Sequence, residues 1–212
     1  MSCCRTCGFD RQFDRALAAR ELEGYRKQGP VATTRALIDA LVREGIQGLT
    51  LIDVGGGVGA VQHALLAAGV RQVWSVEASP AYQNAAKAEA QEQGHAHRIR
   101  FHLGDFTELA ADVPPADIVT LDRVVCCYSD METLVVLSAA RARKLYGLVY
   151  PRDTWWVRVG VRLQNLFRRL WGNPFRTFVH SPQAIDALLR SFGLVLRTNA
   201  RTFAWEVVVY TR

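Results

Sequence analysis

The sequence lacks any run of about 18 apolar residues, so we expect no transmembrane helix. Its N-terminus lacks the apolar segment of a secretory signal peptide, which favours a cytoplasmic protein. Lysine is scarce, at positions 27, 87 and 144 alone, so the net charge of +6 is carried almost entirely by arginine. No zinc finger, helix-turn-helix or RNA-binding aromatic motif occurs, so we expect no nucleic-acid partner.

Cysteine is limited to five residues, at positions 3, 4, 7, 126 and 127. An odd number in a cytosolic chain argues against a disulfide framework. Cys4 and Cys7 nevertheless have the spacing of metal ligands. If residues 1–8 folded over Cys126 and Cys127, several thiolates would form a site for zinc or a metalloid. The alternative is that the cysteines are small apolar residues, and we assign no metal ligand.

Half of the 212 residues are hydrophobic, which suits one α/β domain with a full core. We expect an N-terminal arm and helical cover in residues 1–48 and a compact domain in residues 49–212. Helix-like and strand-like segments alternate after residue 49, which predicts a parallel sheet, closed by an antiparallel hairpin. Expected strands span residues 49–54, 72–77, 98–103, 117–122, 145–150, 194–201 and 203–211, and expected helices span residues 10–27, 33–44, 60–68, 80–93, 130–143, 153–171 and 182–191.

The most informative stretch runs from Leu49 to Gly59, with the sequence LTLIDVGGGVG. It begins as a buried strand and then has four glycines in five positions, at 55, 56, 57 and 59. A helix with apolar spacing follows and stops at Gly69. A strand, a glycine turn and a helix hold a cofactor against the N-terminus of the helix, and glycine lets the backbone approach the ligand.

Acidic residues end the first three strands, and they separate two classes of cofactor. Gly55, Gly57 and Ala60 fit a permissive dinucleotide fingerprint, and Glu77 fits a ribose-binding acid in either class. Asp53, however, would place a negative charge near the pyrophosphate of NAD. S-adenosylmethionine (SAM) has no phosphate and carries cationic groups, which an acid favours. Asp105 after the third strand is suited to accept a hydrogen bond from adenine.

These residues resemble the class I SAM-dependent methyltransferases. The resemblance implies a Rossmann-like sheet of seven strands, mostly parallel, in the order 3-2-1-4-5-7-6 with strand 7 antiparallel and helices on both faces. It also implies SAM as the cofactor and methyl transfer to a small-molecule acceptor as the activity. The SAM-binding positions it implies are Asp53, Gly55, Gly56, Gly57, Gly59, Glu77, Ala78, Asp105, Phe106 and Asp122.

Within that family, two segments resemble magnesium-protoporphyrin O-methyltransferases. One is the loop after the fourth strand, LDRVVCCY at 121–128, and the other is Tyr150-Pro151-Arg152-Asp153 with the arginine-rich helix after it. The resemblance implies a hydrophobic or carboxylate-bearing, tetrapyrrole-like acceptor. The paired cysteines and the cysteine-rich arm depart from that pattern. They leave open a zinc- or metalloid-binding protein on this fold, or a metalloid methyltransferase.

Five residues are candidates for work on the acceptor. Asp122 and Arg123 close the fourth strand, where Arg123 would orient an acidic acceptor or form a structural ion pair. Tyr128 could hydrogen-bond to the acceptor or the cofactor. Tyr25 would cap the pocket or face the core, and His180 would serve as a base or cap a helix. We also expect Arg152 to shape the acceptor pocket.

The expected helix at 153–171 combines tryptophan and other apolar residues with four arginines. Such a helix can lie at a lipid interface, which would be a peripheral membrane contact. The alternative is a lid whose apolar side packs on the core.

Overall fold

A single sheet of seven strands organises the computed structural model, which describes residues 8–212 apart from the side chain of Asp10. The strand order is β3-β2-β1-β4-β5-β7-β6, and β7 is antiparallel to both of its neighbours while the other pairs are parallel. The predicted order and the antiparallel seventh strand are therefore confirmed. The strands are β1 (Thr50–Val54), β2 (Gln72–Glu77), β3 (Ile99–Leu103), β4 (Ala116–Asp122), β5 (Ala142–Pro151), β6 (Val195–Arg201) and β7 (Trp205–Thr211).

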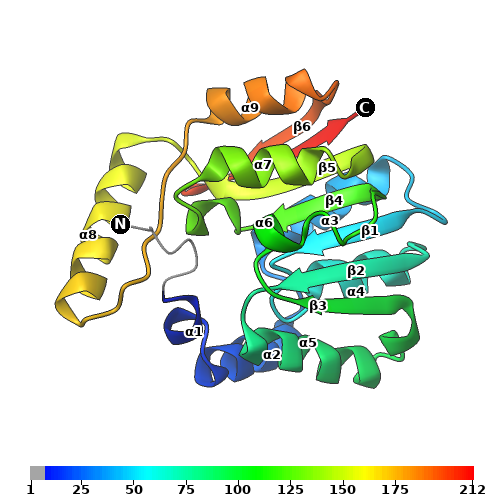
Figure 1. Ribbon diagram of the computed structural model, residues 1–212, viewed down its shortest axis with the longest axis horizontal. Coiled ribbons are helices and arrows are strands. Elements are labelled where there is room, and N and C mark those ends of the chain that lie inside the picture. The colour runs from blue at the N-terminus through cyan, green and yellow to red at the C-terminus, as the bar shows by residue number, and fades with distance from the viewer. Residues whose placement is uncertain (1–7) are drawn as a thin grey trace.

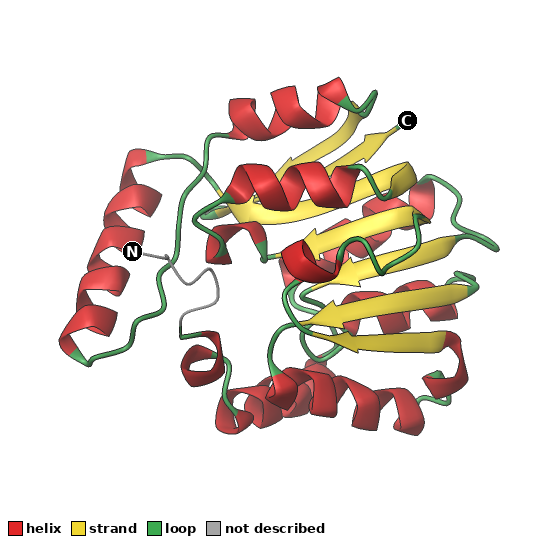
Figure 2. Ribbon diagram, viewed as in Figure 1, coloured by secondary structure: helices red, strands yellow, loops and turns green. Residues whose placement is uncertain are grey.

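Helices cover both faces of the sheet, as Figures 1 and 2 show. On one face, α3 (Ala32–Arg43) and α4 (Ala60–Ala67) pack over a core that includes Leu37, Leu51 and Leu65. On the other face, α6 (Phe106–Leu109), α7 (Met131–Ala139) and α9 (Pro182–Ser191) pack over a larger core. α2 (Arg15–Gln28) lies beside α5 (Pro80–Glu92) near β3, while α8 (Trp155–Leu170) lies away from the sheet. Short helices complete the chain at α1 (Phe9–Gln12), η1 (Ala96–Arg98) and η2 (Val125–Cys127).

Polar side chains cap several helices at the positions predicted from the sequence. Ser79 caps α5 by accepting a hydrogen bond from the Tyr82 amide, and Pro80 follows it at the first turn. Ser181 caps α9 in the same way, ahead of Pro182. These caps fix where α5 leaves the tip of β2 and where α9 returns to the sheet.

Several boundaries differ from the prediction. The expected helix at 10–27 is split into α1 and α2, because Asp14 caps a new helix by accepting from the Leu17 amide at 2.8 Å. The helix expected to reach residue 143 ends at Ala139, since β5 already pairs with β4 at Ala142. The hairpin turn spans residues 202–204, not Thr202 alone. The short helix α6 was not among the predicted helices, and it begins at Asp105, whose side chain accepts a hydrogen bond from the Thr107 amide.

The division of the chain at residue 48 stays a prediction. α3 lies before that boundary yet packs directly on the sheet. A Cβ on Gly147 of β5 would lie 2.8 Å from Leu37 Cδ1, so the helix sits close against the strand. No helix among residues 8–212 has the length and hydropathy needed to cross a bilayer.

Candidate functional site

A cleft that is partly open to solvent lies where the loops after β1, β2, β3 and β4 meet, with about 780 Å³ of empty space when its open mouth is included. Parallel strands place their carboxyl ends at one edge, so loops far apart in sequence converge there. From these loops, the cleft is lined by Gly55, Gly57, Glu77, Ala78, Gly104, Phe106, Asp122, Arg123, Val124, Cys127 and Tyr128. Six of the predicted cofactor and acceptor positions outside the glycines therefore face one space.

The glycine loop follows β1 and brings its backbone to the cleft. Gly55 and Gly57 have φ of +61° and +58°, which glycine adopts without strain. A Cβ on Gly55 would lie 2.6 Å from Val124 Cγ2. The loop is therefore packed closely between β1 and the segment after β4, and only glycine fits at position 55 without a shift.

Glu77 ends β2 and faces the cleft. Its Oε2 accepts a hydrogen bond from the Gly57 amide at 3.1 Å, and its Oε1 accepts one from the Ser79 amide at 2.9 Å. Burial raises the pKa of Glu77, and the backbone amides oppose that rise. The carboxylate thus joins two loops and still has lone pairs free for ligand hydroxyls.

Asp53 lies on the inner side of the glycine loop and does not line the cleft. It is completely buried, and its Oδ1 accepts a 2.7 Å hydrogen bond from the Thr120 hydroxyl. A Cβ on Gly56 would lie 2.5 Å from Asp53 Oδ2, so the carboxylate supports the loop from below. Burial raises the pKa of Asp53 to about 7, and the charges of Asp122 and Glu77 add to the rise. Neither Gly56 nor Gly59 lines the cleft.

Asp105 follows β3 and is held by several donors. Its Oδ1 accepts hydrogen bonds from the Thr107 amide and from the Tyr128 hydroxyl, at 2.8 and 2.9 Å. Its Oδ2 is buried and has no hydrogen-bond partner among the described residues. The residues on either side of it, Gly104 and Phe106, line the cleft. Asp105 therefore lies next to the cleft with one acceptor oxygen unused.

Asp122 ends β4 and Arg123 follows it, at the opposite side of the cleft from β3. The hydroxyl of Thr34, on α3, donates a 2.5 Å hydrogen bond to Asp122 Oδ2. Asp122 Oδ1 is buried without a hydrogen bond, 3.4 Å from Arg123 Nε. Arg123 has φ of +61°, and no other non-glycine residue among those described has a positive φ. Such strained positions concentrate at functional sites.

Aromatic residues close the cleft on its N-terminal side. The ring of Phe9 lies 5.8 Å from that of Tyr128, and the ring of Phe13 lies 5.8 Å from that of Tyr82, both edge to face. Sequence reasoning missed Phe9, Phe13 and Tyr82, and also Glu21 on α2, as lining residues. One feature of the sequence could have identified Phe9 and Phe13: they are four residues apart, a spacing that places both side chains on one face of a helical segment.

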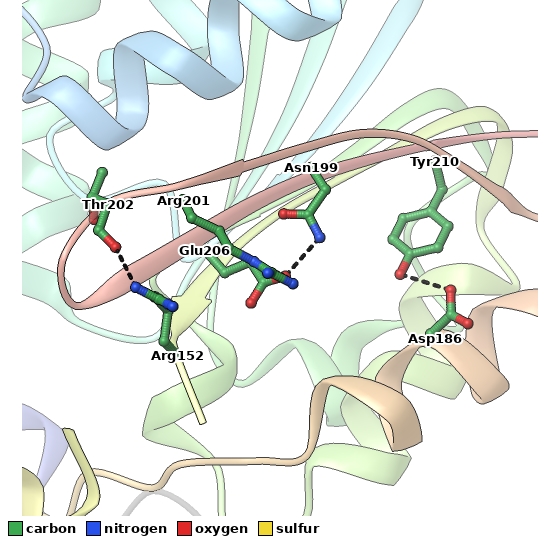
Figure 3. A network of polar contacts seen from close by, with 7 residues as sticks. All are labelled: Arg152, Asp186, Asn199, Arg201, Thr202, Glu206 and Tyr210. Atoms are coloured by element: carbon green, nitrogen blue, oxygen red, sulfur yellow. Dashed lines mark hydrogen bonds and ion pairs between the residues drawn. The ribbon is translucent and has the colours of Figure 1, made fainter. Parts of the chain in front are cut away.

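Three predicted acceptor residues lie apart from the cleft lining. The Tyr25 hydroxyl accepts a 3.3 Å hydrogen bond from Gln93, at the C-terminal end of α5. His180 Nε2–H donates to the Tyr128 carbonyl oxygen at 2.9 Å, and burial lowers the pKa of His180. Arg152 donates to the Thr202 carbonyl oxygen at 3.0 Å, within the polar network of the terminal hairpin in Figure 3. His180 thus does not line the cleft and instead supports the backbone of Tyr128.

The hypothesis of a thiolate metal site depends largely on Cys3, Cys4 and Cys7, which lie outside the described residues. Cys126 and Cys127 lie together, and both thiols donate to the Arg123 carbonyl oxygen, at 3.3 and 3.7 Å. The hydrogen bond with Cys126, together with burial, raises the pKa of Cys127. No group of three possible metal ligands occurs within residues 8–212.

The cleft fits a cationic nucleoside. Three carboxylates line it, from Glu21, Glu77 and Asp122, against the single guanidinium of Arg123. The unused oxygen of Asp105 matches an amino donor beside Phe106. The glycine backbone leaves room for a ligand at the centre. An excess of negative charge favours a sulfonium and an ammonium over a phosphate.

Known proteins support this assignment at two levels. The family model of the O-methyltransferase domain matches residues 17–147. A ribosomal protein L11 methyltransferase from Psychrobacter is 36% identical over 92 residues, which is 42% of this chain. The chain covers only 30% of the length of that relative.

Solved structures share the fold at low identity. A magnesium protoporphyrin IX methyltransferase from Synechocystis PCC 6803, solved with bound SAH, superposes with a TM-score of 0.69 at 22% identity, over 85% of this chain and 81% of that chain. An O-methyltransferase family protein from Burkholderia thailandensis superposes with a TM-score of 0.73 at 14% identity, over 98% of this chain and 63% of that chain. Because the matched family model spans more than half of the sequence, the chain belongs to the O-methyltransferase domain family, and its sheet has the strand order of the class I SAM-dependent methyltransferase fold.

Proposed function

We propose that this enzyme methylates a small molecule that has an extended apolar surface and an ionised carboxylate, as a tetrapyrrole has. The observation that carries the proposal is the position of Arg123. It supplies the single cationic side chain among the described residues of the cleft. Its Nε lies 3.4 Å from Asp122 Oδ1, and the apolar residues Val124 and Cys127 line the same cleft. A guanidinium in an apolar cleft favours an apolar ligand with one anionic group. The Synechocystis neighbour is a magnesium protoporphyrin IX methyltransferase, and such an acceptor is consistent with this proposal.

The proposed roles of the chain follow from its geometry. Glu77 accepts from ribose hydroxyls, the Gly55–Gly57 backbone approaches the amino-acid part of SAM, and Asp105 with Phe106 holds adenine. Bound SAM supplies a methyl group that is already activated as a sulfonium. The protein then contributes mainly alignment of the acceptor with that methyl group. Asp53 acts through the glycine loop and through its charge, since it does not reach the cleft.

The acceptor side is formed by the segment after β4 and by the N-terminal cover. Arg123 would pair with the acceptor carboxylate, while Phe9, Phe13 and Tyr128 would contact its apolar part and exclude water. Asp122 has a buried oxygen without a hydrogen bond, next to Arg123. This oxygen is placed to hold a proton leaving an acceptor hydroxyl, or to fix the guanidinium when the acceptor is a carboxylate.

Methyl transfer from radiolabelled SAM to a panel of acceptors tests the proposal. The panel contains magnesium protoporphyrin IX, the same compound with its carboxylates esterified, ribosomal protein and RNA. We expect transfer to the free acid alone. Arg123→Gln should lower kcat/KM for that acceptor about thirtyfold or more, because a paired charge is lost from a partly buried site. Exposed Arg143→Gln is the control. Methyl transfer to protein or RNA, or an unchanged kcat/KM in Arg123→Gln, would contradict the proposed function.

A further inference from the structure

α8 has two faces with opposite roles. Val157 is buried, Asn165 exchanges hydrogen bonds with the backbone of Thr177, and Arg168 donates to the Thr177 hydroxyl at 2.7 Å. Arg168 also lies over the ring of Phe175, 4.9 Å from its centre. These residues fall on one stripe of the helix, so this stripe attaches α8 to the segment at 173–178.

The opposite face of α8 is apolar and uncovered. At 3.6 residues per turn, its residues lie about half a turn from the attached stripe. Leu163, Leu166 and Phe167 are each 50% exposed, and Leu170 is 71% exposed. The complete set of exposed apolar side chains on this face is Trp155, Trp156, Val159, Leu163, Leu166, Phe167 and Leu170, followed by Trp171. Figure 1 shows that α8 lies at the side of the molecule, away from the sheet. A patch of this size on one element marks an interaction surface.

The patch continues onto the terminal hairpin. The Trp156 ring stacks on the Phe203 ring with centres 6.2 Å apart, and Phe203 is 79% exposed. Phe203 lies in the turn between β6 and β7, far from α8 in sequence. Two separate elements thus present apolar side chains next to each other, which is what contact with an extended surface requires.

Arginines flank the apolar face. Arg158, Arg162 and Arg169 share a stripe beside it, and all three are exposed. Arg158 pairs with Asp153, whereas no ion pair joins Arg162 or Arg169 to a described residue. α8 contains no aspartate or glutamate. Its polar flank is therefore positively charged throughout.

We infer that α8 and Phe203 lie in the interface of an anionic phospholipid bilayer. An amphipathic helix with tryptophans and leucines on one face and arginines on its flank buries its apolar side at the level of the acyl chains and pairs its arginines with headgroup phosphates. A second copy of the chain fits less well. Packing of two copies of this face would bring arginine stripes together with no acid on α8 to offset them.

Flotation of the purified full chain with vesicles tests the inference. One set of vesicles contains phosphatidylcholine alone, and the other contains phosphatidylcholine with phosphatidylglycerol. We expect strong binding to the anionic vesicles, weak binding to the neutral ones, and a decrease at high salt. Leu163→Ser should weaken binding about tenfold, because a leucine is lost from the buried face. The double variant Arg162→Gln, Arg169→Gln should weaken binding to the anionic vesicles alone.

Val31→Ser provides a matched control, since Val31 is 53% exposed and lies on the cap of α3, in a different part of the fold. Its flotation should equal that of the wild type, and SAH binding should be unchanged in every variant. Three results would overturn the inference: no flotation with anionic vesicles, equal binding in Leu163→Ser, or a stable dimer that Leu163→Ser converts to a monomer in sedimentation.

Discussion

The hydroxyl of Tyr128 donates a 2.9 Å hydrogen bond to Asp105 Oδ1, and this bond ties the loop after β4 to the start of α6. Both side chains are buried, at 4% and 6% exposure. The bond therefore joins the acceptor side of the cleft to the side proposed to hold adenine.

Tyr128→Phe should lower the free energy of unfolding by about 1.5–3 kcal/mol, because a buried hydrogen bond to a charged group is lost. Urea unfolding measures this change. The control is Tyr150→Phe, since Tyr150 is also buried and its hydroxyl makes no hydrogen bond with a described residue. Equal losses in the two variants would show that the bond to Asp105 contributes little.

Arg123 combines a strained backbone with a side chain in the cleft. Arg123→Gly should raise the free energy of unfolding by about 1 kcal/mol, because glycine adopts its φ of +61° without strain. Arg123→Ala removes the same guanidinium but keeps the strain, so it should not be stabilised. Both variants should lose activity to a similar degree. Thermal unfolding and turnover, measured side by side, separate the two effects, and equal melting temperatures in the two variants would reject the strain argument.

Gly55 packs directly against Val124. Gly55→Ala should destabilise the protein by about 2 kcal/mol or more, because the new Cβ combines an unfavourable φ with a 2.6 Å approach to Val124 Cγ2. Adding Val124→Ala removes the clash but not the φ penalty, so it should restore part of the loss. Gly57→Ala is the comparison, since its Cβ would meet only the Tyr82 ring at 3.7 Å. A loss in Gly57→Ala as large as that in Gly55→Ala would contradict the packing argument.

Local pattern predicted most of the sheet. Each parallel strand was a short apolar run bounded by glycine, proline or an acid, and the hairpin followed from two strands with almost no separation. The errors lie where a single contact decides a boundary. Asp14 breaks the first helix by capping the second, and pairing of Ala142 with Ala116 ends α7 early. Neither contact has a periodic signal in the sequence.

The strand-tip residues of the cleft were predictable, because parallel strands bring their ends together. Glu77, Phe106, Asp122 and Arg123 line the cleft as expected. The position of the N-terminal cover was not predictable, because no sequence pattern determines how helices that precede a sheet pack over it. Phe9 reaches Tyr128 across more than a hundred residues, and Tyr25 faces Gln93 although it is on the same cover.

Glu77 is proposed to hold the ribose of SAM. Glu77→Ala should weaken SAM binding by roughly 2 kcal/mol, the cost of losing a hydrogen bond to a charged group. The Gly57 and Ser79 amides also lose their acceptor, so the melting temperature should fall as well. Calorimetric titration measures the affinity, with exposed Glu92→Ala as the control. An unchanged dissociation constant for SAM would reject the ribose role.

Asp53 should make stability depend on pH near neutrality. Burial raises its pKa from 3.8 to about 7 in the folded chain, so the folded state holds a proton that the unfolded state has already lost. Its contribution to stability is therefore full below about pH 4 and is lost as the pH rises through about 7. Asp53→Asn does not ionise, so it should become more stable relative to the wild type between about pH 5 and about pH 8. Urea unfolding across that range measures the difference, with exposed Asp112→Asn as the control.

The same carboxyl should couple SAM affinity to pH. A cation in the cleft favours the ionised form of Asp53, so binding should release a proton near neutrality and tighten as the pH rises through about 7. Titrations in two buffers with different heats of ionisation would detect the released proton. In Asp53→Asn the release should vanish and the affinity should become flat over this range. Proton release of equal size in the variant would assign it to another group and leave Asp53 as a support for the glycine loop alone.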